Sequence, residues 1–227
     1  MMRPTLFARV YYWAANRLYD EFAWAYDWTS WLVSFGKWDA HRSQVLDYIQ
    51  GIRILEIGFG TGEILLKLSG ENYFVTGVDC SIPMHRITKR KFNQRDIPCK
   101  TVLGRTQSLP FSSKSFDCII STFPAEFICD LNTFLEFKRI LSQEDDKRGQ
   151  FPGRVVVCGA IFRRDDGIIN RLFRFLFGEP DKQAEELFSE LAGKAGFRFS
   201  IIQSKDDKIQ LPVMLFEANS TGNGKSK

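Results

Sequence analysis

Three glycines with an acidic residue in front of them are the most chemically informative stretch of the sequence. Residues 53–62 read RILEIGFGTG, an apolar run followed by Gly58, Gly60 and Gly62. A glycine-rich turn at the carboxyl end of a strand lets a ligand approach the bare backbone. Glu56 stands just before the turn, where its carboxylate would repel a pyrophosphate and attract an ammonium or a sulfonium. The stretch therefore indicates a site for a ligand that carries positive charge.

The spacing of the glycines separates two classes of cofactor. A dinucleotide fingerprint needs G-x-G-x-x-G or A, but Glu63 stands at the third position and the glycine comes one residue early, at Gly62. Together with Glu56, this spacing disfavours an NAD-dependent oxidoreductase and favours S-adenosylmethionine. The run VTGVD ends in Asp79, about twenty residues beyond the glycines, where an acid can accept both hydroxyls of an adenosine ribose.

A parallel sheet would bring these residues to one edge, and the hydrophobic pattern predicts such a sheet. From residue 51 onward, apolar runs alternate with segments of helical periodicity, which is typical of a mainly parallel sheet covered on both faces. We predict strands at 52–57, 73–79, 99–103, 115–121, 153–160, 197–203 and 209–217. We predict helices at 62–69, 82–94, 130–141 and 182–195, the second of them capped by Ser81.

The first fifty residues differ from the rest, because they hold all five tryptophans and five of the six tyrosines. Four of the tryptophans recur at helical spacing. This segment is interpreted either as a core helix laid across the sheet edge or over the cofactor, or as a cover for an acceptor pocket formed by Tyr19, Tyr26 and Trp28. We thus predict an N-terminal helical cap, an α/β domain with a Rossmann-like, doubly wound, seven-stranded sheet, and a disordered tail, over residues 1–50, 51–218 and 219–227.

Composition and charge exclude several classes of protein. The chain has 31 Lys+Arg and 27 Asp+Glu, a net charge of +4, and 44% hydrophobic residues, as ordinary globular domains do. So small a charge does not indicate nucleic acid, and the basic run over 86–95 is interpreted as a solvated helix face. Five scattered cysteines and two histidines disfavour disulfides and a metal site, and favour a reducing compartment. No apolar run approaches the ~20 residues of a spanning helix, so we expect a cytoplasmic protein.

The motifs resemble, in order and spacing, those of the class I S-adenosylmethionine-dependent methyltransferases over residues 50–217. The matching segments are LEIGFGTG, VDCSIPM, and GRTQSLPF followed by SFD. The last of these is similar to a motif of the small-molecule methyltransferases of ubiquinone and menaquinone biosynthesis. The resemblance implies S-adenosyl-L-methionine as the cofactor, with Asp79 on the ribose and Cys80 and Met84 around the adenine. It also implies cofactor contacts from Glu56, Gly58, Phe59, Gly60, Thr61, Gly62, Arg105, Thr106 and Ser121.

One part of the adenine site departs from the family pattern. Arg105 and Thr106 replace Asp and Ala, so the side chain that usually accepts from the adenine amino group is missing. A backbone carbonyl or Gln107 could take its place. Cys80 is interpreted as a wall of this pocket rather than a nucleophile, because no basic residue is evidently placed to lower its pKa. His85 is expected on the surface of the helix predicted at 82–94.

The exit of the fourth predicted strand bears on the acceptor. Its sequence, STFPAE, lacks the [DN]-P-P-[FYW] motif used on nucleobase amines and the Pro-Cys pair of pyrimidine C5 enzymes, so no nucleic-acid partner is expected. Methyl transfer is an in-line displacement on an activated sulfonium, and positioning supplies much of the acceleration. Should a base be needed, Tyr26, Asp27 and Glu126 are the candidates.

These observations predict methyl transfer to a small, lipophilic acceptor: a quinone-like ring, a phospholipid amine or an aromatic hydroxyl. The apolar segment 167–177 suits an interfacial helix, an acceptor channel or a core helix. Peripheral membrane contact through 168–177 or through the N-terminal helices is a hypothesis that follows. The alternative is a module that binds S-adenosylmethionine or a protein partner without catalysis. The sequence indicates no oligomeric state.

Overall fold

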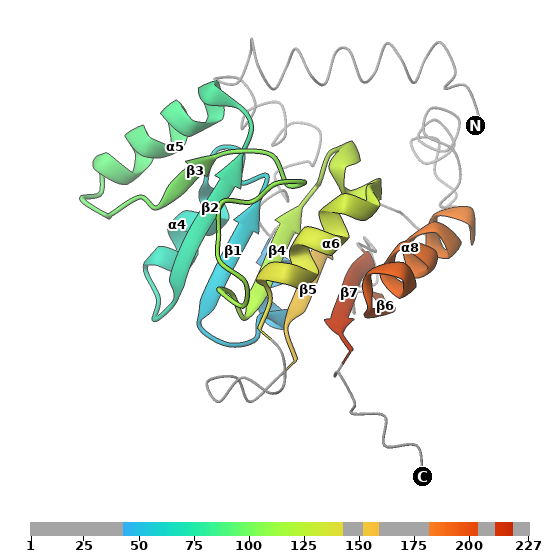
Figure 1. Cartoon of the computed structure of the whole chain (residues 1–227). Coiled ribbons are helices and arrows are strands. Elements are labelled where there is room, and N and C mark those ends of the chain that lie inside the picture. The colour runs from blue at the N-terminus through green and yellow to red at the C-terminus, as the bar shows by residue number, and fades with distance from the viewer. Residues whose placement is uncertain (1–42, 143–151, 159–181, 204–211, 220–227) are drawn as a thin grey trace, which may run out of the picture.

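A seven-stranded sheet forms the centre of the fold, and helices lie on both of its faces (Figure 1). The structure, a computed structural model, describes residues 43–142, 152–158, 182–203 and 212–219. The strands are β1 (Arg53–Ile57), β2 (Phe74–Asp79), β3 (Thr101–Leu103), β4 (Cys118–Thr122), β5 (Arg154–Cys158), β6 (Phe197–Gln203) and β7 (Pro212–Ala218). The helices are α4 (Glu63–Ser69), α5 (Ile82–Asn93), α6 (Leu131–Ile140) and α8 (Lys182–Ala195), with short 3-10 helices η2 (Gln44–Tyr48) and η3 (Glu126–Cys129).

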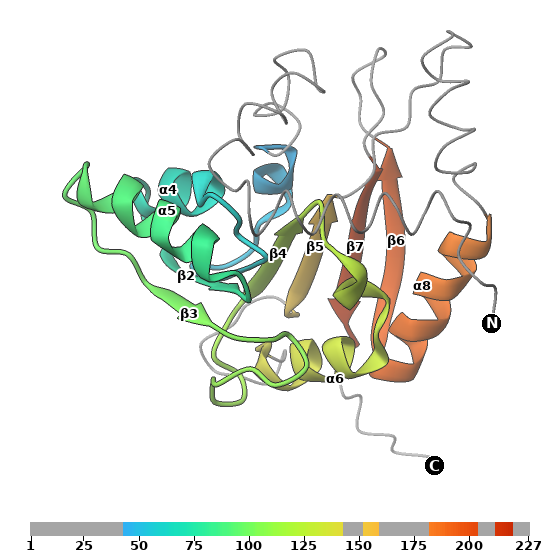
Figure 2. The same ribbon diagram turned by 90° about the horizontal axis from the view of Figure 1, so that it is seen from above.

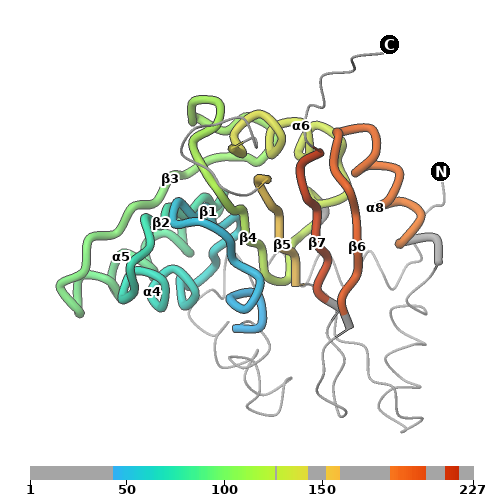
Figure 3. Tube along the Cα trace, turned by 90° about the horizontal axis from the view of Figure 1, so that it is seen from below, coloured from blue at the N-terminus to red at the C-terminus, as the bar shows by residue number. Residues whose placement is uncertain are grey.

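The order of the strands creates one reversal in the middle of the sheet. The order is β3-β2-β1-β4-β5-β7-β6, and β1 pairs in parallel with both β2 and β4. The connections that follow β1 and β4 leave in opposite directions, which opens a crevice at the carboxyl ends of these strands. β7 runs antiparallel to both β5 and β6, and the β6–β7 pair forms one end of the sheet (Figure 3).

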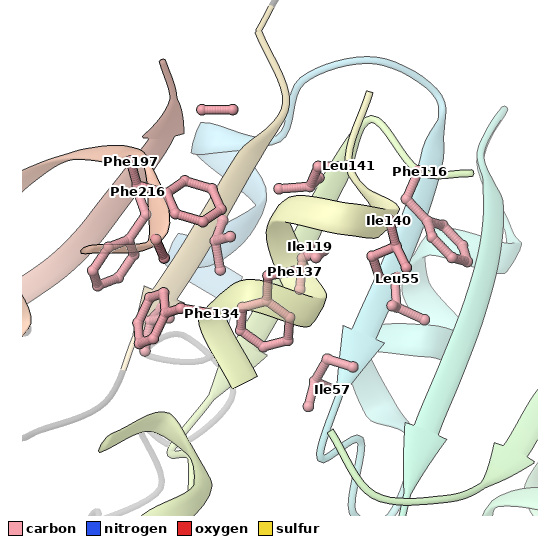
Figure 4. Packing of buried hydrophobic residues seen from close by; sticks show 14 of the residues in the cluster. Leu55, Ile57, Phe116, Ile119, Phe134, Phe137, Ile140, Leu141, Phe197 and Phe216 are labelled. Atoms are coloured by element: carbon pink, nitrogen blue, oxygen red, sulfur yellow. The ribbon is translucent and has the colours of Figure 1, made fainter. Parts of the chain in front are cut away.

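Alternate residues of the central strands point to opposite faces of the sheet. Leu55 and Ile57 pack in a cluster with the buried phenylalanines of α6, on the face that α6 and α8 cover (Figures 2 and 4). Ile54 packs in a second cluster, with the leucines of α4 and with Phe92 of α5. Because both faces of the sheet are covered, residues 54–57 of β1 are apolar apart from Glu56.

The predicted fold class is confirmed, and each of the seven strands and four helices predicted between residues 52 and 217 lies within about three residues of its expected bounds. Parallel pairing holds from β3 to β5, and the last two strands supply the antiparallel end. The predicted N-terminal cap falls outside the described residues except for 43–50, and the segment 168–177 falls outside them entirely. Within the described ranges no helix is both long and apolar enough to cross a bilayer.

Candidate cofactor-binding site

The glycine loop after β1 has the left-handed backbone that its sequence suggests. Gly58, Gly60 and Gly62 have φ values of 68°, 53° and 78°. Residues with a Cβ rarely adopt such φ values, so the backbone conformation of the loop requires glycine at these positions. The Gly58 N–H donates to the carbonyl of Val78 at 2.8 Å, which joins the loop to the end of β2. A Cβ added at Gly58 would make only ordinary contact, 3.7 Å from the Phe127 ring.

The close packing of α5 is a second reason why residue 62 must be glycine. A Cβ at Gly62 would lie 2.5 Å from Cγ2 of Thr88, a distance at which one of the two must move. The Thr88 hydroxyl donates to the carbonyl of Gly60 at 3.0 Å, so α5 also fixes the loop by a hydrogen bond. Gly62 thus lets α5 approach the start of α4 and hold the glycine loop in place.

Asp79 joins three segments at the carboxyl edge of the sheet. Its side chain is 3% exposed, and its Oδ2 accepts from the Gly60 N–H at 2.9 Å. Its Oδ1 accepts from the Ser81 N–H at 2.8 Å, at the start of α5, and Ser81 caps that helix as predicted. Its backbone carbonyl accepts from the Gly104 N–H at 3.0 Å, in the loop after β3. The acid expected on the ribose therefore also organises the loops around it.

Glu56 places a carboxylate in the interior of the sheet, one residue before β1 ends. It is 1% exposed and stands opposite Gly77 on β2 and Ile120 on β4. A buried carboxylate is costly unless a donor or a cation compensates it. Negative charge beside an open glycine backbone fits a ligand with an ammonium group. The residues of this chain thus fit an amino-acid-bearing nucleoside such as S-adenosylmethionine.

The loop after β3 is attached to the start of α6. Gln107 Nε2 donates to Oδ2 of Asp130 at 3.1 Å, and the Thr133 hydroxyl donates to the Thr106 hydroxyl at 3.4 Å. Thr106 is buried, whereas Arg105 is exposed. The amide nitrogen of Gln107, the residue offered as a substitute for the missing adenine acceptor, is therefore bonded to Asp130.

The L-P-F part of the third motif is held by an ion pair on α6. Glu136 accepts from the Leu109 N–H at 2.9 Å, while Arg139 donates to the carbonyls of Leu109 and Phe111 at 2.9 and 2.6 Å. Arg139 also bonds Glu136, and this hydrogen bond is the main cause of the lowered pKa of Glu136. These contacts give 109–111 a structural role on the α6 side of the sheet.

The aspartate that ends the third motif is structural as well. Asp117 precedes β4, at the amino edge of the sheet, and accepts from the backbone N–H groups of Ile52 and Arg53, both at 3.0 Å. The Arg53 side chain donates to its other oxygen. A Cβ at Gly51 would lie 2.3 Å from Cβ of Asp117, so that glycine makes room for the aspartate. Asp117 fastens the start of β1 rather than facing the glycine loop.

The exit of β4 contains a feature that the sequence did not indicate. The Ser121 hydroxyl is fully buried and donates to the Ile57 carbonyl at 2.8 Å, which ties the ends of β4 and β1 together. Phe123 has a φ of 50°, although it is not glycine, and its N–H donates to the Cys158 carbonyl at 2.6 Å. A phenylalanine keeps a left-handed backbone only when the surrounding structure fixes it. Such strained residues are frequent at active sites and ligand-binding sites.

The structure brings part of the site predicted from sequence together. The glycine loop, Asp79 and Ser121 share one edge of the sheet through the hydrogen bonds described above. Cys80 is exposed, and Met84 is fully buried. The base candidates Tyr26 and Asp27 lie outside the described residues, as do Tyr19 and Trp28, and so does the side chain of Glu126, whose backbone begins η3.

One expectation was wrong. His85 is 8% exposed instead of lying on the surface, because its ring packs against Phe59 of the glycine loop. It shares the inner face of α5 with Thr88 and Phe92, at intervals of three and seven residues. This spacing was readable in the sequence, but the polar residue type argued against burial.

Residues 54–144 match the family model described as a methyltransferase domain. This stretch of the chain thus carries a methyltransferase domain. The match covers β1 to α6, and so includes the glycine loop, Asp79 and the loop after β3. Among the described residues, no group of three or more His, Cys, Asp and Glu side chains could hold a metal ion.

Several curated relatives of this domain are demethylmenaquinone methyltransferases by name. A demethylmenaquinone methyltransferase of Thermotoga maritima is 29% identical over 136 residues, which cover 57% of this chain and 58% of that protein. A demethylmenaquinone methyltransferase of Tropheryma whipplei is 30% identical over 148 residues, which cover 63% of this chain and 57% of that protein. The chain thus spans less than three fifths of the length of these relatives.

Solved structures share the fold of the methyltransferase domain at low identity. A methyltransferase structure from Methanococcus maripaludis has a TM-score of 0.58 at 18% identity, covering 79% of this chain and 84% of its own. Geranyl diphosphate C-methyltransferase from Streptomyces coelicolor has a TM-score of 0.58 at 11% identity, covering 80% of this chain and 79% of that one. The cyclase SpnF scores 0.57 at 14%, covering 81% of both chains. Proteins with different named reactions therefore share this fold.

Proposed function

We propose that the protein transfers a methyl group from S-adenosylmethionine to a small, lipophilic acceptor. The observation that carries the proposal is the position of Asp79, buried at the end of β2 and bonded to the Gly60 N–H. It puts an acid for the ribose beside a left-handed glycine backbone, with buried Glu56 at the end of the neighbouring strand. When bound, the cofactor would supply a methyl group already activated on a sulfonium.

The work left to the protein is mainly positional. The glycine loop and Asp79 would hold the two ends of the cofactor, and the carboxyl ends of β1 and β4 would border the acceptor, since ligands of such sheets bind at the strand reversal. Bringing acceptor and methyl group into line converts a bimolecular step into an effectively unimolecular one. A general base is needed only for an acceptor that must lose a proton.

A quinone-like ring is the acceptor we favour, with a phospholipid amine and an aromatic hydroxyl as alternatives. The names of the relatives from Thermotoga maritima and Tropheryma whipplei support the quinone-like ring, because they describe demethylmenaquinone methyltransferases. Peripheral membrane contact, in a cytoplasmic protein, belongs to the same proposal, since such acceptors partition into lipid. Sedimentation with anionic and neutral liposomes tests it, and absence of enrichment on both removes it.

Calorimetric titration with S-adenosylmethionine and S-adenosylhomocysteine tests the cofactor. Wild type is expected to bind both ligands. Asp79→Ala is expected to bind neither, because the substitution removes the carboxylate that fixes the glycine loop. Glu71→Ala is the matched control, since Glu71 is an exposed acid in the turn before β2, away from the glycine loop. No binding by folded wild type would overturn the proposal and favour a module that keeps the fold for a partner.

Transfer of labelled methyl groups to a panel of acceptors then tests the reaction. The panel contains a demethylated naphthoquinol, a phospholipid with a primary amine and a simple phenol. We expect label in the naphthoquinol. Label confined to one of the other two would correct the acceptor class while leaving the cofactor assignment in place.

A further inference from the structure

His85 touches two of the segments that shape the cofactor site. Its Nε2 lies 3.1 Å from the backbone carbonyl oxygen of Asp79. Its ring meets the Phe59 ring edge to face, with centroids 4.8 Å apart and an interplanar angle of 75°. Phe59 belongs to the glycine loop, and Asp79 is the acid at the end of β2. One buried side chain of α5 therefore contacts both.

The hydrogen bond to the Asp79 carbonyl determines that Nε2 of the imidazole carries a hydrogen. A carbonyl oxygen can only accept, so Nε2 must carry the hydrogen and donate it. The same carbonyl accepts from the Gly104 N–H at 3.0 Å, in the loop after β3. Two donors thus converge on this oxygen, one from α5 and one from the loop that precedes Arg105. The glycine loop, the end of β2 and the loop after β3 meet at this point.

We propose that His85 is a positioning residue that holds these three segments in the arrangement that binds the cofactor, an inference that rests on the proposed function. Without the imidazole donor, the Asp79 carbonyl loses the hydrogen bond from α5 and keeps the one from Gly104. The carboxylate of Asp79 and the Gly60 N–H to which it is bonded then lose their fixed relative position. The effect falls on affinity for the cofactor, because within the described part of the chain His85 contacts the site through Asp79 and Phe59.

Two substitutions separate the hydrogen bond from the packing. His85→Leu fills the volume beside Phe59 but cannot donate, whereas His85→Gln keeps an N–H donor on a side chain of similar reach. Arg86→Leu is the control, because Arg86 is the exposed neighbour on the same helix. His85→Met provides the comparison without a donor if His85→Leu does not fold.

The first measurement is affinity for S-adenosylhomocysteine, with kcat and the cofactor KM where an acceptor is turned over. His85→Leu is expected to bind about tenfold more weakly, the worth of about one net hydrogen bond, with kcat at saturating cofactor within about twofold of wild type. His85→Gln is expected to stay within about threefold of wild type, and Arg86→Leu to match it. Equal loss in His85→Gln and His85→Leu, wild-type affinity in His85→Leu, or a fall in kcat with unchanged KM would overturn the proposal.

The second measurement needs no ligand, so it separates failure of this inference from failure of the proposed function. Hydrogen exchange of the Gly60 and Gly104 amides is expected to be faster in His85→Leu than in wild type, and unchanged in Arg86→Leu. If wild type bound no cofactor, the proposed function would fail while this readout still decided whether His85 holds the loops. Unchanged exchange at both glycines in His85→Leu would overturn the positioning role.

Discussion

The Gly60 N–H donates to Oδ2 of Asp79 at 2.9 Å, which links the loop after β1 to the acid that ends β2. These two strands are neighbours in parallel register, with Ile57 opposite Val78. Their carboxyl ends would meet in any such sheet, but the hydrogen bond fixes how the loop and the acid are oriented. The two parts of the predicted site thus form one unit before any ligand is considered.

Asp79→Asn is expected to weaken binding of S-adenosylhomocysteine by about 10- to 100-fold. The carboxylate accepts from Gly60 and Ser81 on its two oxygens, and an amide must turn its NH₂ toward one of these donors. Calorimetry measures the effect, with Glu71→Gln as the control, because Glu71 is an exposed acid in the turn before β2. Equal affinity in Asp79→Asn and wild type would contradict the role given to both oxygens.

Two glycine substitutions are expected to change stability in opposite directions. Gly62→Ala combines a left-handed backbone with a Cβ 2.5 Å from Thr88, and should lower the free energy of unfolding by about 2–4 kcal/mol. Gly193→Ala lies within α8, where a Cβ would meet nothing within 4 Å, and should raise it by about 0.5–1 kcal/mol. Urea unfolding measures both, and a stable Gly62→Ala would show that Thr88 can move aside.

Asp117 is expected to make stability depend on pH in the acid range. Burial alone would raise the pKa of Asp117, but the hydrogen bonds from the Arg53 side chain and from the backbone N–H groups of Arg53 and Ile52 outweigh it, so the pKa is lowered. A folded-state pKa below the unfolded one gives stability that is full above the unfolded value, about 4, and is lost as pH falls through the folded value.

Asp117→Asn therefore lowers the free energy of unfolding by about 2–3 kcal/mol at neutral pH, and by less at acid pH. Denaturant unfolding of wild type and variant from pH 7 down to pH 3 measures the difference. Because Asp117 lies at the edge of the sheet away from the glycine loop, cofactor affinity should not change in the folded variant. A constant stability difference over the whole range would show that the carboxylate charge is not what stabilises β1.

Arg139→Met is expected to release the loop around Leu109 from α6. The variant removes the donors to the Leu109 and Phe111 carbonyls, and it leaves Glu136 without the guanidinium that lowers its pKa. Hydrogen exchange over 105–111 should quicken, with a loss of stability of about 1–3 kcal/mol. Lys194→Met, on an exposed surface pair of α8, is the control. Unchanged exchange in Arg139→Met would mean that the loop is held by packing alone.

The sheet could be predicted because its signals are local. β1 is an apolar run that ends in turn glycines, and α5 begins with a serine cap followed by Ile82-Pro83, so each element carries its own marks. The glycine loop and Asp79 were predictable for the same reason. Their spacing follows from neighbouring parallel strands, and the chemistry of glycine and of a carboxylate at those places is specific.

The roles of Asp117, His85 and Phe123 depended on contacts that a single sequence does not show. Asp117 is bonded to Arg53, 64 residues away, and only the pairing of β1 with β4 brings them together. His85 was misplaced because residue type outweighed its position on the inner face of α5. The left-handed backbone of Phe123 had no sequence signal, since phenylalanine before proline favours an extended backbone.

The antiparallel position of β7 has a consequence for synthesis of the chain. β6 is made before β7, yet within the described sheet β6 pairs only with β7, and β7 alone connects it to β5. At about 5–20 residues per second, translation of the 159–211 interval takes several seconds, during which β5 has an unpaired edge on the nascent chain. An exposed strand edge is a template for wrong pairing. We therefore expect the sheet to form in chain order only as far as β5, and to be completed when 212–218 inserts between β5 and β6.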